Sequence, residues 1–345
     1  MHIEYNKRFL SIALSAICTA TLTALLALWA TFSSFCGTDP EFVCIRHNAD
    51  AATVKGLLAE KASMPKRVVF NTLAGLTGYY NHIRPGRYDI GSGTSTLEVF
   101  RAMRNGSETP QRITIRLVRT VDDLADFLSE ELEPSAEDFR KALTDSVALK
   151  AMGLTPENGI SLFIPNTYEV YWSTSAEDFV KRMKKESDAF WTPERTACLA
   201  DIAPTCTKAD AITLASIVEQ ETQYAPERPN VAGMYINRLH KNMPLQADPT
   251  VKYALGDFTI RRITGEHLRV ESPYNTYRTQ GLPPGPICIP SIASIDAVLH
   301  YAHHNYLYMC AKEDFSGSHN FAATYSEHMA NAARYRHALD KRNIH

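Results

Sequence analysis

The chain opens with a long run of residues that carries no charge. Residues 9–35 contain no Asp, Glu, Lys or Arg, and Leu, Ile, Ala, Phe and Trp make up most of them. About 20 apolar residues are needed for a helix to cross the core of a bilayer, so this run is long enough. Two basic residues precede it and two acidic residues follow it: Lys7, Arg8, Asp39 and Glu41. By the positive-inside rule, we expect residues 1–8 to be a cytoplasmic tail and residues 9–35 a single transmembrane helix.

A cleaved signal peptide is the alternative interpretation of the same run. The apolar region of a signal peptide is usually about 7–15 residues long and ends at a small-residue cleavage site. This run is longer and shows no clean site of that kind. We therefore expect a single-pass anchor in the cell inner (cytoplasmic) membrane, with the rest of the chain on the extracytoplasmic, periplasmic side.

After residue 35 the hydrophobic pattern changes to short helices and short strands. Apolar residues recur at helical spacing over residues 50–62, which predicts a helix, whereas Val68-Val-Phe70 fits either a helix or a strand. Arg84-Pro-Gly-Arg-Tyr88 predicts a turn into a short strand. Ser95 is a candidate cap for a helix that ends at Asn105-Gly106. We expect residues 36–110 to form a compact α+β subdomain.

The next hundred residues predict a connecting α/β segment, residues 111–206. Alternation over residues 112–118 predicts a strand, because Ile113, Ile115 and Leu117 share one face. Helices are expected over residues 120–132, 135–149 and 175–191, and a loop over residues 163–168 that leads into a short strand.

Composition and charge narrow the class of protein. Lys and Arg number 36 and Asp and Glu number 38, so the net charge is −2, and 45% of residues are hydrophobic. A disordered chain would be poorer in apolar residues, and a nucleic-acid binder would have a basic excess, so we expect neither. A mean hydropathy of −0.23 excludes a polytopic membrane protein. The length of 345 residues allows two or three domains.

The seven cysteines form no C-x-x-C pair, so a zinc ribbon is not expected. Two pairs, Cys36/Cys44 and Cys198/Cys206, are close enough in sequence to close a short loop. If the extracytoplasmic part lies in an oxidising compartment, either pair could form a disulfide, and the sequence leaves this open.

Residues 207–222 predict the helix that carries the candidate chemistry. Thr207 and Asp210 fit a capping box at its start. A buried stripe is expected along one face, and Glu219 stands at the edge of that apolar surface, while Glu221 is rotated by about 200° and points elsewhere. Partial burial would raise the pKa of the Glu219 carboxyl, which suits a general acid near neutral pH. The alternative is a solvated helix residue paired with a Lys or Arg.

Polar side chains in rigid Pro- and Gly-rich loops follow this helix. Tyr, Asn, Gln and Thr side chains can bond the hydroxyl and acetamide groups of sugars, and a Tyr ring offers a flat face to a sugar ring. They occur in Gln246-Ala-Asp-Pro-Thr250, Ser272-Pro-Tyr-Asn-Thr-Tyr277 and Gln280-Gly-Leu-Pro-Pro-Gly-Pro286.

These segments together resemble the endolytic murein transglycosylase family, also called the YceG-like family. The resemblance covers nearly the whole chain, including the apolar run and a LysM-like βα unit near residues 84–106. It is carried by Ala215-Ser-Ile-Val-Glu-Gln-Glu-Thr222, Asn237-Arg-Leu239, Leu245-Gln-Ala-Asp-Pro-Thr250, Tyr274-Asn-Thr-Tyr277, Gly281-Leu-Pro-Pro-Gly-Pro-Ile287, and His319, Phe321 and His328.

The resemblance implies an α+β fold with a LysM-like subdomain over residues 36–110 and a C-terminal α+β catalytic domain over residues 207–345. It implies cleavage of the MurNAc-β-1,4-GlcNAc bond within glycan strands, a product that ends in 1,6-anhydro-MurNAc, and Glu219 as the catalytic acid and then base. It implies no cofactor and no metal. Partners would be peptidoglycan strands, the membrane and a nearby peptidoglycan synthase, whose nascent strands the enzyme would terminate, and no nucleic acid.

Further site residues follow as hypotheses from the same resemblance. We expect substrate-binding side chains at Gln246, Tyr274, Asn275, Gln280 and His319. We expect supporting roles for Glu221, Asp248 and Asn320.

One segment departs from the family pattern. Where the family often has Phe-Pro-Asp-Thr-Tyr, this chain reads Phe163-Ile-Pro-Asn166-Thr-Tyr168. Ile164 is inserted and Asn166 replaces the Asp of the family pattern, so the role of this position is left open.

Two other functions fit the residues. One is a muramidase in which Glu219 works with Asp248 as a second carboxylate, giving reducing ends. The other is a non-catalytic wall-binding protein in which Glu219 is merely structural.

Overall fold

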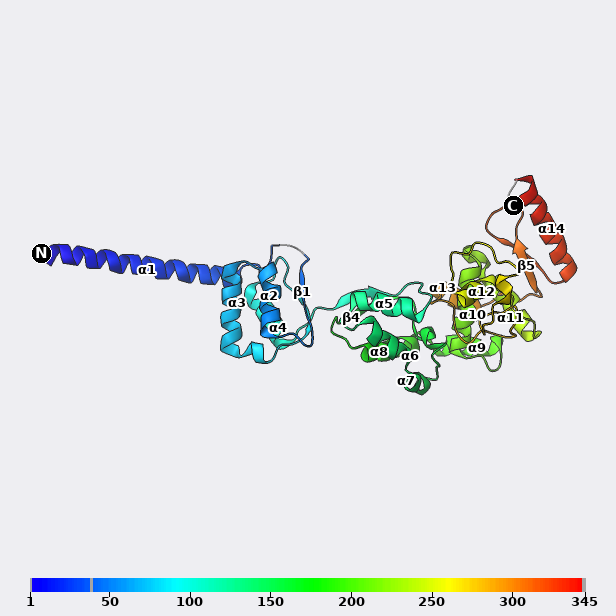
Figure 1. The fold of residues 1–345 in the computed structure, drawn as a ribbon, viewed down its shortest axis with the longest axis horizontal. Coiled ribbons are helices and arrows are strands. Elements are labelled where there is room, and N and C mark those ends of the chain that lie inside the picture. Colours follow the sequence, from blue (N-terminus) through cyan, green and yellow to red (C-terminus); the bar gives the residue numbers. More distant parts are fainter. Residues whose placement is uncertain (1, 38–39, 343–345) are drawn as a thin grey trace. The chain divides into compact units, whose positions relative to one another are not determined.

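A computed structural model of the chain describes residues 2–37 and 40–342, and the chain divides into two compact units (Figure 1). The first comprises residues 1–113, 131–133 and 169–174, and the second comprises the remainder. Most of the expected connecting segment and all of the expected catalytic domain therefore lie in the second unit. The secondary structure is a mixture of helices and short strands, as the predicted α+β class requires.

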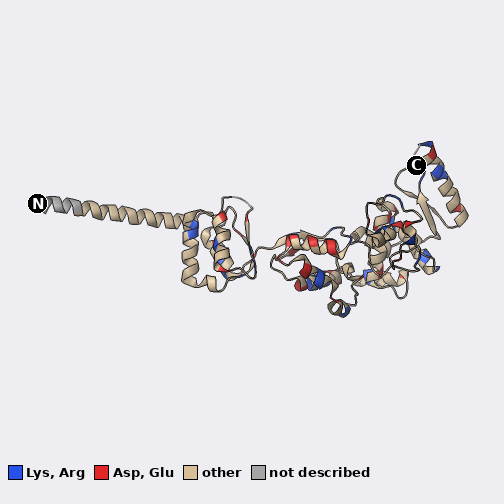
Figure 2. Ribbon diagram, in the orientation of Figure 1, with Lys and Arg blue, Asp and Glu red and all other residues tan. Residues whose placement is uncertain are grey.

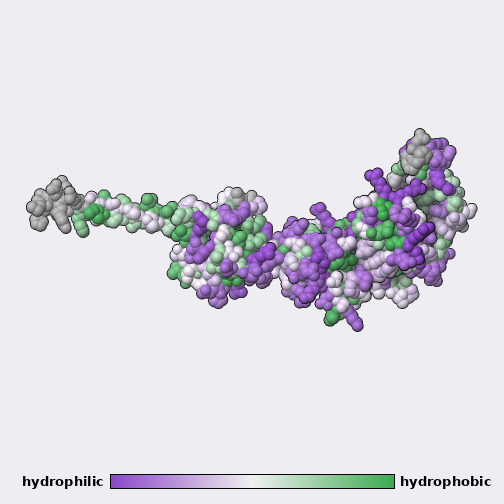
Figure 3. Space-filling model, viewed as in Figure 1, coloured by the Kyte–Doolittle hydropathy of each residue, from purple (hydrophilic) through white to green (hydrophobic). Residues whose placement is uncertain are grey.

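The N-terminal apolar run forms one long helix, α1 (His2–Phe32). Its stretch Phe9–Phe32 is long and apolar enough to cross a membrane, and its side chains are almost all exposed (Figure 3). Met1 lies outside the described residues, and the expected tail continues the helix from His2. The helix ends at Phe32, three residues before the predicted end of the span at residue 35: Phe35 is buried in the core of the first unit, and Ser34 forms a β-bridge with Ser95.

The first unit packs short helices around an antiparallel strand pair. Strand β1 (Phe42–Ile45) pairs with β2 (Gly86–Asp89), so that Phe42 lies opposite Asp89. The helices are α2 (Ala51–Lys61), α3 (Met64–Thr77) and α4 (Thr96–Asn105), with a single 3₁₀ turn at Tyr79–Asn81.

Local capping explains where these helices begin and end. Ser95 caps α4 as predicted and forms a capping box with Glu98, and Gly106 ends that helix in the left-handed conformation. The ambiguous apolar segment around Phe70 is helical, because Phe70 points into an aromatic cluster with Tyr79 and Phe100.

The strand predicted over residues 112–118 is shorter than expected. It forms β3 (Gln111–Thr114), which pairs with β4 (Thr167–Val170) in a two-stranded sheet. Ile115 is still buried, but Leu117 is exposed, so the predicted buried face ends one residue after the strand and does not extend to Leu117.

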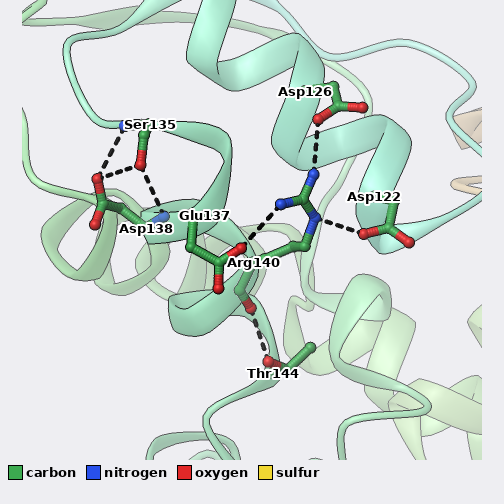
Figure 4. Close-up of polar contacts among 7 residues, drawn as sticks. All are labelled: Asp122, Asp126, Ser135, Glu137, Asp138, Arg140 and Thr144. Atoms are coloured by element: carbon green, nitrogen blue, oxygen red, sulfur yellow. Dashed lines mark hydrogen bonds and ion pairs between the residues drawn. The ribbon is translucent and has the colours of Figure 1, made fainter.

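Helices α5 (Val121–Glu131), α6 (Ala136–Thr144) and α7 (Ser146–Ala151) follow β3. One continuous helix was predicted over residues 135–149, which is wrong: Asp145 adopts an extended conformation, ends α6 and caps α7. Arg140 on α6 holds Asp122 and Asp126 on α5 at 2.7 and 3.0 Å (Figure 4). These pairs are exposed, so each contributes little stability.

The core of the second unit surrounds helix α10 (Lys208–Glu221). This helix packs against α9 (Pro193–Ile202), α11 (Arg228–His240), α12 (Asp248–Leu255) and α13 (Ile292–Leu299). Helix α8 (Ala176–Phe190) and 3₁₀ turns at Gly159–Leu162, Ala225–Glu227 and His267–Arg269 complete this part.

A C-terminal hairpin and helix complete the chain. Strand β5 (Tyr308–Ala311) pairs antiparallel with β6 (His319–Ala322), and α14 (Tyr325–Lys341) packs on both.

The Pro- and Gly-rich loop before α13 approaches the rest of the second unit closely. A Cβ atom on Gly285 would lie 1.9 Å from the Glu157 carbonyl oxygen, so only glycine fits there. None of the seven cysteines forms a disulfide, including both pairs that the sequence left open.

Candidate active site

Glu219 lies in the last turn of α10, a helix that is buried on every side. A single buried stripe was expected, but each residue from 211 to 219 is buried, because other helices cover α10 all round. The Glu219 side chain is consequently only slightly accessible, and the residue is 9% exposed. A carboxyl in such a place must find hydrogen-bond donors, because an unpaired buried charge is costly.

The start of α13 supplies most of those donors. Ser291, which caps α13, donates to Glu219 Oε2 from its backbone nitrogen at 3.1 Å and also from its hydroxyl. The Ser294 hydroxyl donates to the same oxygen at 2.7 Å. The positive end of the α13 dipole adds to this attraction for an anion.

Arg228 holds the other carboxylate oxygen. Its Nη2 donates to Glu219 Oε1 at 3.1 Å, and its Nη1 donates to Ser291 Oγ at 3.1 Å. Both side chains of this ion pair are largely buried.

These contacts set the protonation of Glu219. Burial raises the pKa of the carboxyl, but the hydrogen bonds from Ser291 and Ser294 and the charge of Arg228 together bring the pKa below its usual value. The expectation of a raised pKa is therefore wrong for this structure. The interpretation of Glu219 as a solvated residue is also wrong, although a basic partner is present.

Glu219 lines a cleft of about 370 Å³. Two segments form its walls beside Glu219 and Ser291: Thr114, Ile115, Arg116 and Leu117 from the end of β3, and Pro165, Asn166 and Thr167 from the segment that enters β4. Glu219 is the one carboxylic acid among these lining residues. Arg116 has no ion-pair or hydrogen-bond partner within the described part of the chain.

A second buried carboxyl, Glu221, lies two residues further along α10 in different surroundings. Its Oε2 is shielded from solvent and has no hydrogen-bond partner within the described residues. Burial raises the pKa of Glu221 to about 7, with a further contribution from the charge of Asp248, although the Tyr235 hydroxyl donates to the carboxyl. Asp248 in turn accepts a hydrogen bond from Tyr277 Oη at 2.6 Å.

Gln246 lies close to this second carboxyl group. It is exposed, adopts a left-handed backbone (φ 51°), and its Oε1 accepts from Arg238 Nη1 at 3.4 Å. Arg238 also lowers the pKa of Glu221 by its charge. The structure thus brings Gln246, Asp248 and Glu221 together around Arg238.

The loop over residues 272–280 carries three of the predicted substrate-binding residues, Tyr274, Asn275 and Gln280, and their surroundings differ from one another. The Tyr274 ring packs on Tyr253, with centroids 4.6 Å apart. Asn275 is fully buried, and its Nδ2 donates to the carbonyl oxygens of Leu268 and Val270 at 3.0 and 2.8 Å. Asn275 therefore holds the loop together, and Gln280 is exposed.

His319 lies in β6 and is bound to Glu227. Its backbone nitrogen and Nδ1 lie 2.9 and 2.7 Å from the Glu227 carboxylate, which also accepts from Thr222 Oγ1 at the end of α10. Because Glu227 directly precedes Arg228, this network fixes the segment that holds Glu219. Asn320 donates to Glu313 at 2.7 Å, on the hairpin itself.

Sequence reasoning missed Arg228, Ser291, Ser294 and Arg116. In the sequence, Ser291 and Ser294 lie at the beginning of an apolar run, a pattern typical of the start of a helix. This pattern could have indicated that the N-terminus of a second helix lies at the site. The sequence singles out Asn166 only as a departure from a pattern, and the structure places it in the same cleft as Glu219.

Comparison with known proteins gives a consistent result. The model of the YceG-like family matches residues 43–334. An endolytic murein transglycosylase of Bacillus subtilis is 36% identical over 162 residues, which are 47% of this chain and 43% of the relative. One of Streptococcus pneumoniae is 24% identical over 315 residues, covering 81% of this chain and 56% of the relative.

Solved structures include a similar chain. A crystal structure of a YceG-like protein from Listeria monocytogenes matches with a TM-score of 0.56 and 26% identity, covering 85% of this chain and 98% of that one. The present chain spans about half the length of the curated relatives that it matches.

Proposed function

The chain belongs to the YceG-like family, and on that premise we propose that it is an endolytic murein transglycosylase. It cleaves the MurNAc-β-1,4-GlcNAc bond within glycan strands and leaves a 1,6-anhydro-MurNAc end. The observation that carries this proposal is the single carboxyl, Glu219, in a cleft that is otherwise lined by neutral and basic side chains.

A single carboxyl suffices for this reaction. A glycosidase that adds water usually needs two carboxyls, one as acid and one as base or nucleophile. In the proposed reaction Glu219 protonates the glycosidic oxygen as the bond from C1 to that oxygen breaks. The C6 hydroxyl of the same sugar then attacks C1, and its proton passes to the Glu219 carboxylate.

The first step requires a protonated Glu219, whereas the surrounding donors favour the carboxylate. A glycan strand that fills the cleft excludes water from Glu219, and that desolvation raises the pKa toward the acid form. Arg228 and the two serines would then stabilise the carboxylate that remains after proton transfer.

Arg116 and Asn166 are proposed as sugar contacts from the cleft walls. Arg116 is a cation without a partner among the described residues, and the lactyl side chain and stem peptides of murein carry carboxyl groups that it can bind. The exposed Gln246 and Gln280 and the half-buried Tyr274 are proposed to bind the strand further along. Asn275 and His319 would hold their segments in place, and Glu221, Asp248 and Asn320 would support them.

Helix α1 is proposed as a single-pass anchor in the inner membrane, with its N-terminus in the cytoplasm. Such an anchor would place the cleft near membrane-bound peptidoglycan synthases, whose strands the enzyme would terminate. The proposed cleavage reaction and the proposed membrane anchor require no cofactor or metal, and neither of them involves nucleic acid.

The two-carboxylate muramidase is less well supported. Asp248 does not line the Glu219 cleft and instead bonds Tyr277 and shifts the pKa of Glu221.

The experiment incubates the full chain, in detergent micelles, with purified glycan strands and identifies the products by mass spectrometry. Anhydro ends, lighter by one water than hydrolysis products, would support the proposal if Glu219→Gln abolishes them. Reducing ends would indicate a muramidase. Binding without cleavage by either protein would indicate a wall-binding protein.

A further inference from the structure

Helix α3 exposes an apolar face that the first unit does not use. Met64, Val68 and Leu76 are 69%, 52% and 80% exposed. The other exposed residues of the same helix, Asn71, Thr72, Gly75 and Thr77, are uncharged. The opposite face, with Phe70 and Ala74, is buried in the core.

The other helices of this unit have surfaces of the usual kind. Helix α2 exposes Lys55 and Glu60, and α4 exposes Arg101 and Arg104. An exposed helix face with large apolar side chains and no charge generally marks a contact surface.

This face lies next to the membrane-spanning stretch. The end of α1 contacts α3, where Lys66 Nζ lies 5.4 Å from the centre of the Trp29 ring and donates to the Ser34 carbonyl oxygen. Figure 1 shows α3 lying across the end of α1, with α2 on its other side. Trp residues are enriched where a spanning helix leaves the bilayer. Helix α3 therefore lies at the end of the spanning stretch, close to the point where α1 would leave the bilayer, and Met64 and Val68 on its exposed face border a groove beside Lys55 and Ala59 of α2.

The charge around α3 fits an anionic surface. Between Glu60 and Asp89 the chain has no acidic residue over 28 positions, but it has five cations there: Lys61, Lys66, Arg67, Arg84 and Arg87. Lys61 pairs with Glu41, and Lys66 and Arg67 lie in α3 itself. Figure 2 shows α3 with basic residues at its beginning and no acidic residue. Anionic lipid headgroups attract such segments.

We propose that α3 is an interfacial helix that rests on the lipid headgroups, with Met64, Val68 and Leu76 inserted at the boundary of the acyl chains. Interfacial helices bury their apolar face about 5–10 Å into this region. The proposal rests on the proposed membrane span of α1. Its consequence is that the first unit lies flat on an anionic membrane instead of moving freely on a tether.

The test places a tryptophan on this face in the full chain. Val68→Trp is reconstituted in vesicles of phosphatidylethanolamine and phosphatidylglycerol whose acyl chains carry bromine near the glycerol end, a short-range quencher of Trp emission. The parent chain, with Trp29, Trp172 and Trp191, gives the background. Asn48→Trp is the matched control, because residue 48 is exposed in the turn after β1. Leu76→Trp is a second reporter, and circular dichroism checks that each variant is folded.

We expect the tryptophan added in Val68→Trp, and likewise in Leu76→Trp, to lose a large part of its emission in brominated vesicles and to be protected from aqueous acrylamide. The tryptophan added in Asn48→Trp should show neither effect. Phosphatidylcholine in place of phosphatidylglycerol should reduce the quenching in both α3 variants.

Three results would overturn the proposal. If Trp29 is quenched but the tryptophans added to α3 are not, α1 spans the membrane and α3 does not contact it. If protection from acrylamide rises with the ratio of protein to lipid and bromine has no effect, a second copy of the chain covers the face. If Trp29 is not quenched either, both the anchor and the α3 contact are wrong.

Discussion

Glu219 and Glu221 are two residues apart on one helix, and both carboxyls are buried, yet their pKa values move in opposite directions. The pKa of Glu219 falls below its usual value, whereas that of Glu221 rises to about 7. The difference lies in their neighbours. Glu219 receives hydrogen bonds from Ser291, Ser294 and Arg228, while Glu221 has one donor among the described residues, Tyr235, and faces a second carboxyl, Asp248.

Burial alone therefore does not decide the protonation of a carboxyl. Donors that point at the charged form outweigh desolvation at Glu219, and their scarcity leaves desolvation dominant at Glu221. The two sites also affect stability in opposite ways. The depressed pKa of Glu219 stabilises the fold above about pH 4.5, the usual Glu value, and this contribution is lost as the pH falls through the lowered pKa.

Replacing each carboxyl by its amide should separate the two sites most strongly in activity. Glu219→Gln removes the proposed acid and base, so anhydro-end formation should fall by about 10²–10⁴-fold. Glu221→Gln is the matched control and should retain activity within about tenfold, since Glu221 lies outside the cleft. Rates would be measured by release of anhydro ends from glycan strands. Equal losses in both variants would show that the two carboxyls act as one unit.

The same control variant should change stability with a defined pH dependence. The raised pKa of Glu221 keeps its proton in the folded state, whereas the unfolded chain loses it above about pH 4.5. Wild-type stability should therefore decrease between pH 4.5 and about 7, and Glu221→Gln should remove about 3 kcal/mol of this decrease.

Denaturant unfolding of the full chain in micelles, followed by tryptophan emission, to which the core residue Trp191 contributes, would test this. At pH 4 the variant should match wild type, and at pH 8 it should be more stable. A variant less stable than wild type at pH 8 would mean that the folded protein needs the Glu221 carboxylate.

Removing one donor should move Glu219 toward the behaviour of Glu221. Ser294→Ala deletes a hydrogen bond to the carboxylate, so the pKa of Glu219 should rise. If Glu219 is the acid, the alkaline limb of the kcat/KM profile should move to higher pH. Ser146→Ala, at the exposed start of α7, is the control. A shift to lower pH, or none, would contradict the assignment of Ser294 as a stabiliser of the carboxylate.

The smallest effect is expected at the cleft wall. Arg116→Gln should raise KM for glycan strands by about three- to tenfold with little change in kcat, because a surface-exposed ionic contact is worth about 1 kcal/mol. Arg112→Gln, an exposed arginine of β3 that does not line the cleft, should leave KM unchanged. An unchanged KM in Arg116→Gln would remove Arg116 from the proposed substrate contacts.

Local signals predicted much of the fold correctly. The capping residues Ser95 and Thr207 start α4 and α10 where the sequence indicated, since a capping box is completed within four residues. The predicted strand beyond Thr114 and the continuous helix through Asp145 were wrong. Alternation and helical spacing indicate which side chains are buried, whereas strand length depends on a partner segment and a helix break depends on the geometry of one residue.

The sequence by itself determined the long apolar helix, the family and the candidate carboxyl, because a charge-free run and ordered motifs are properties of the chain. Only the tertiary structure decided what surrounds that carboxyl. Arg228, Ser291 and Ser294 lie 9, 72 and 75 positions from Glu219 and meet it through the packing of α10 against α11 and α13. A pKa is fixed by the donors and charges within a few ångströms, and no local pattern specifies which distant residues the fold brings there.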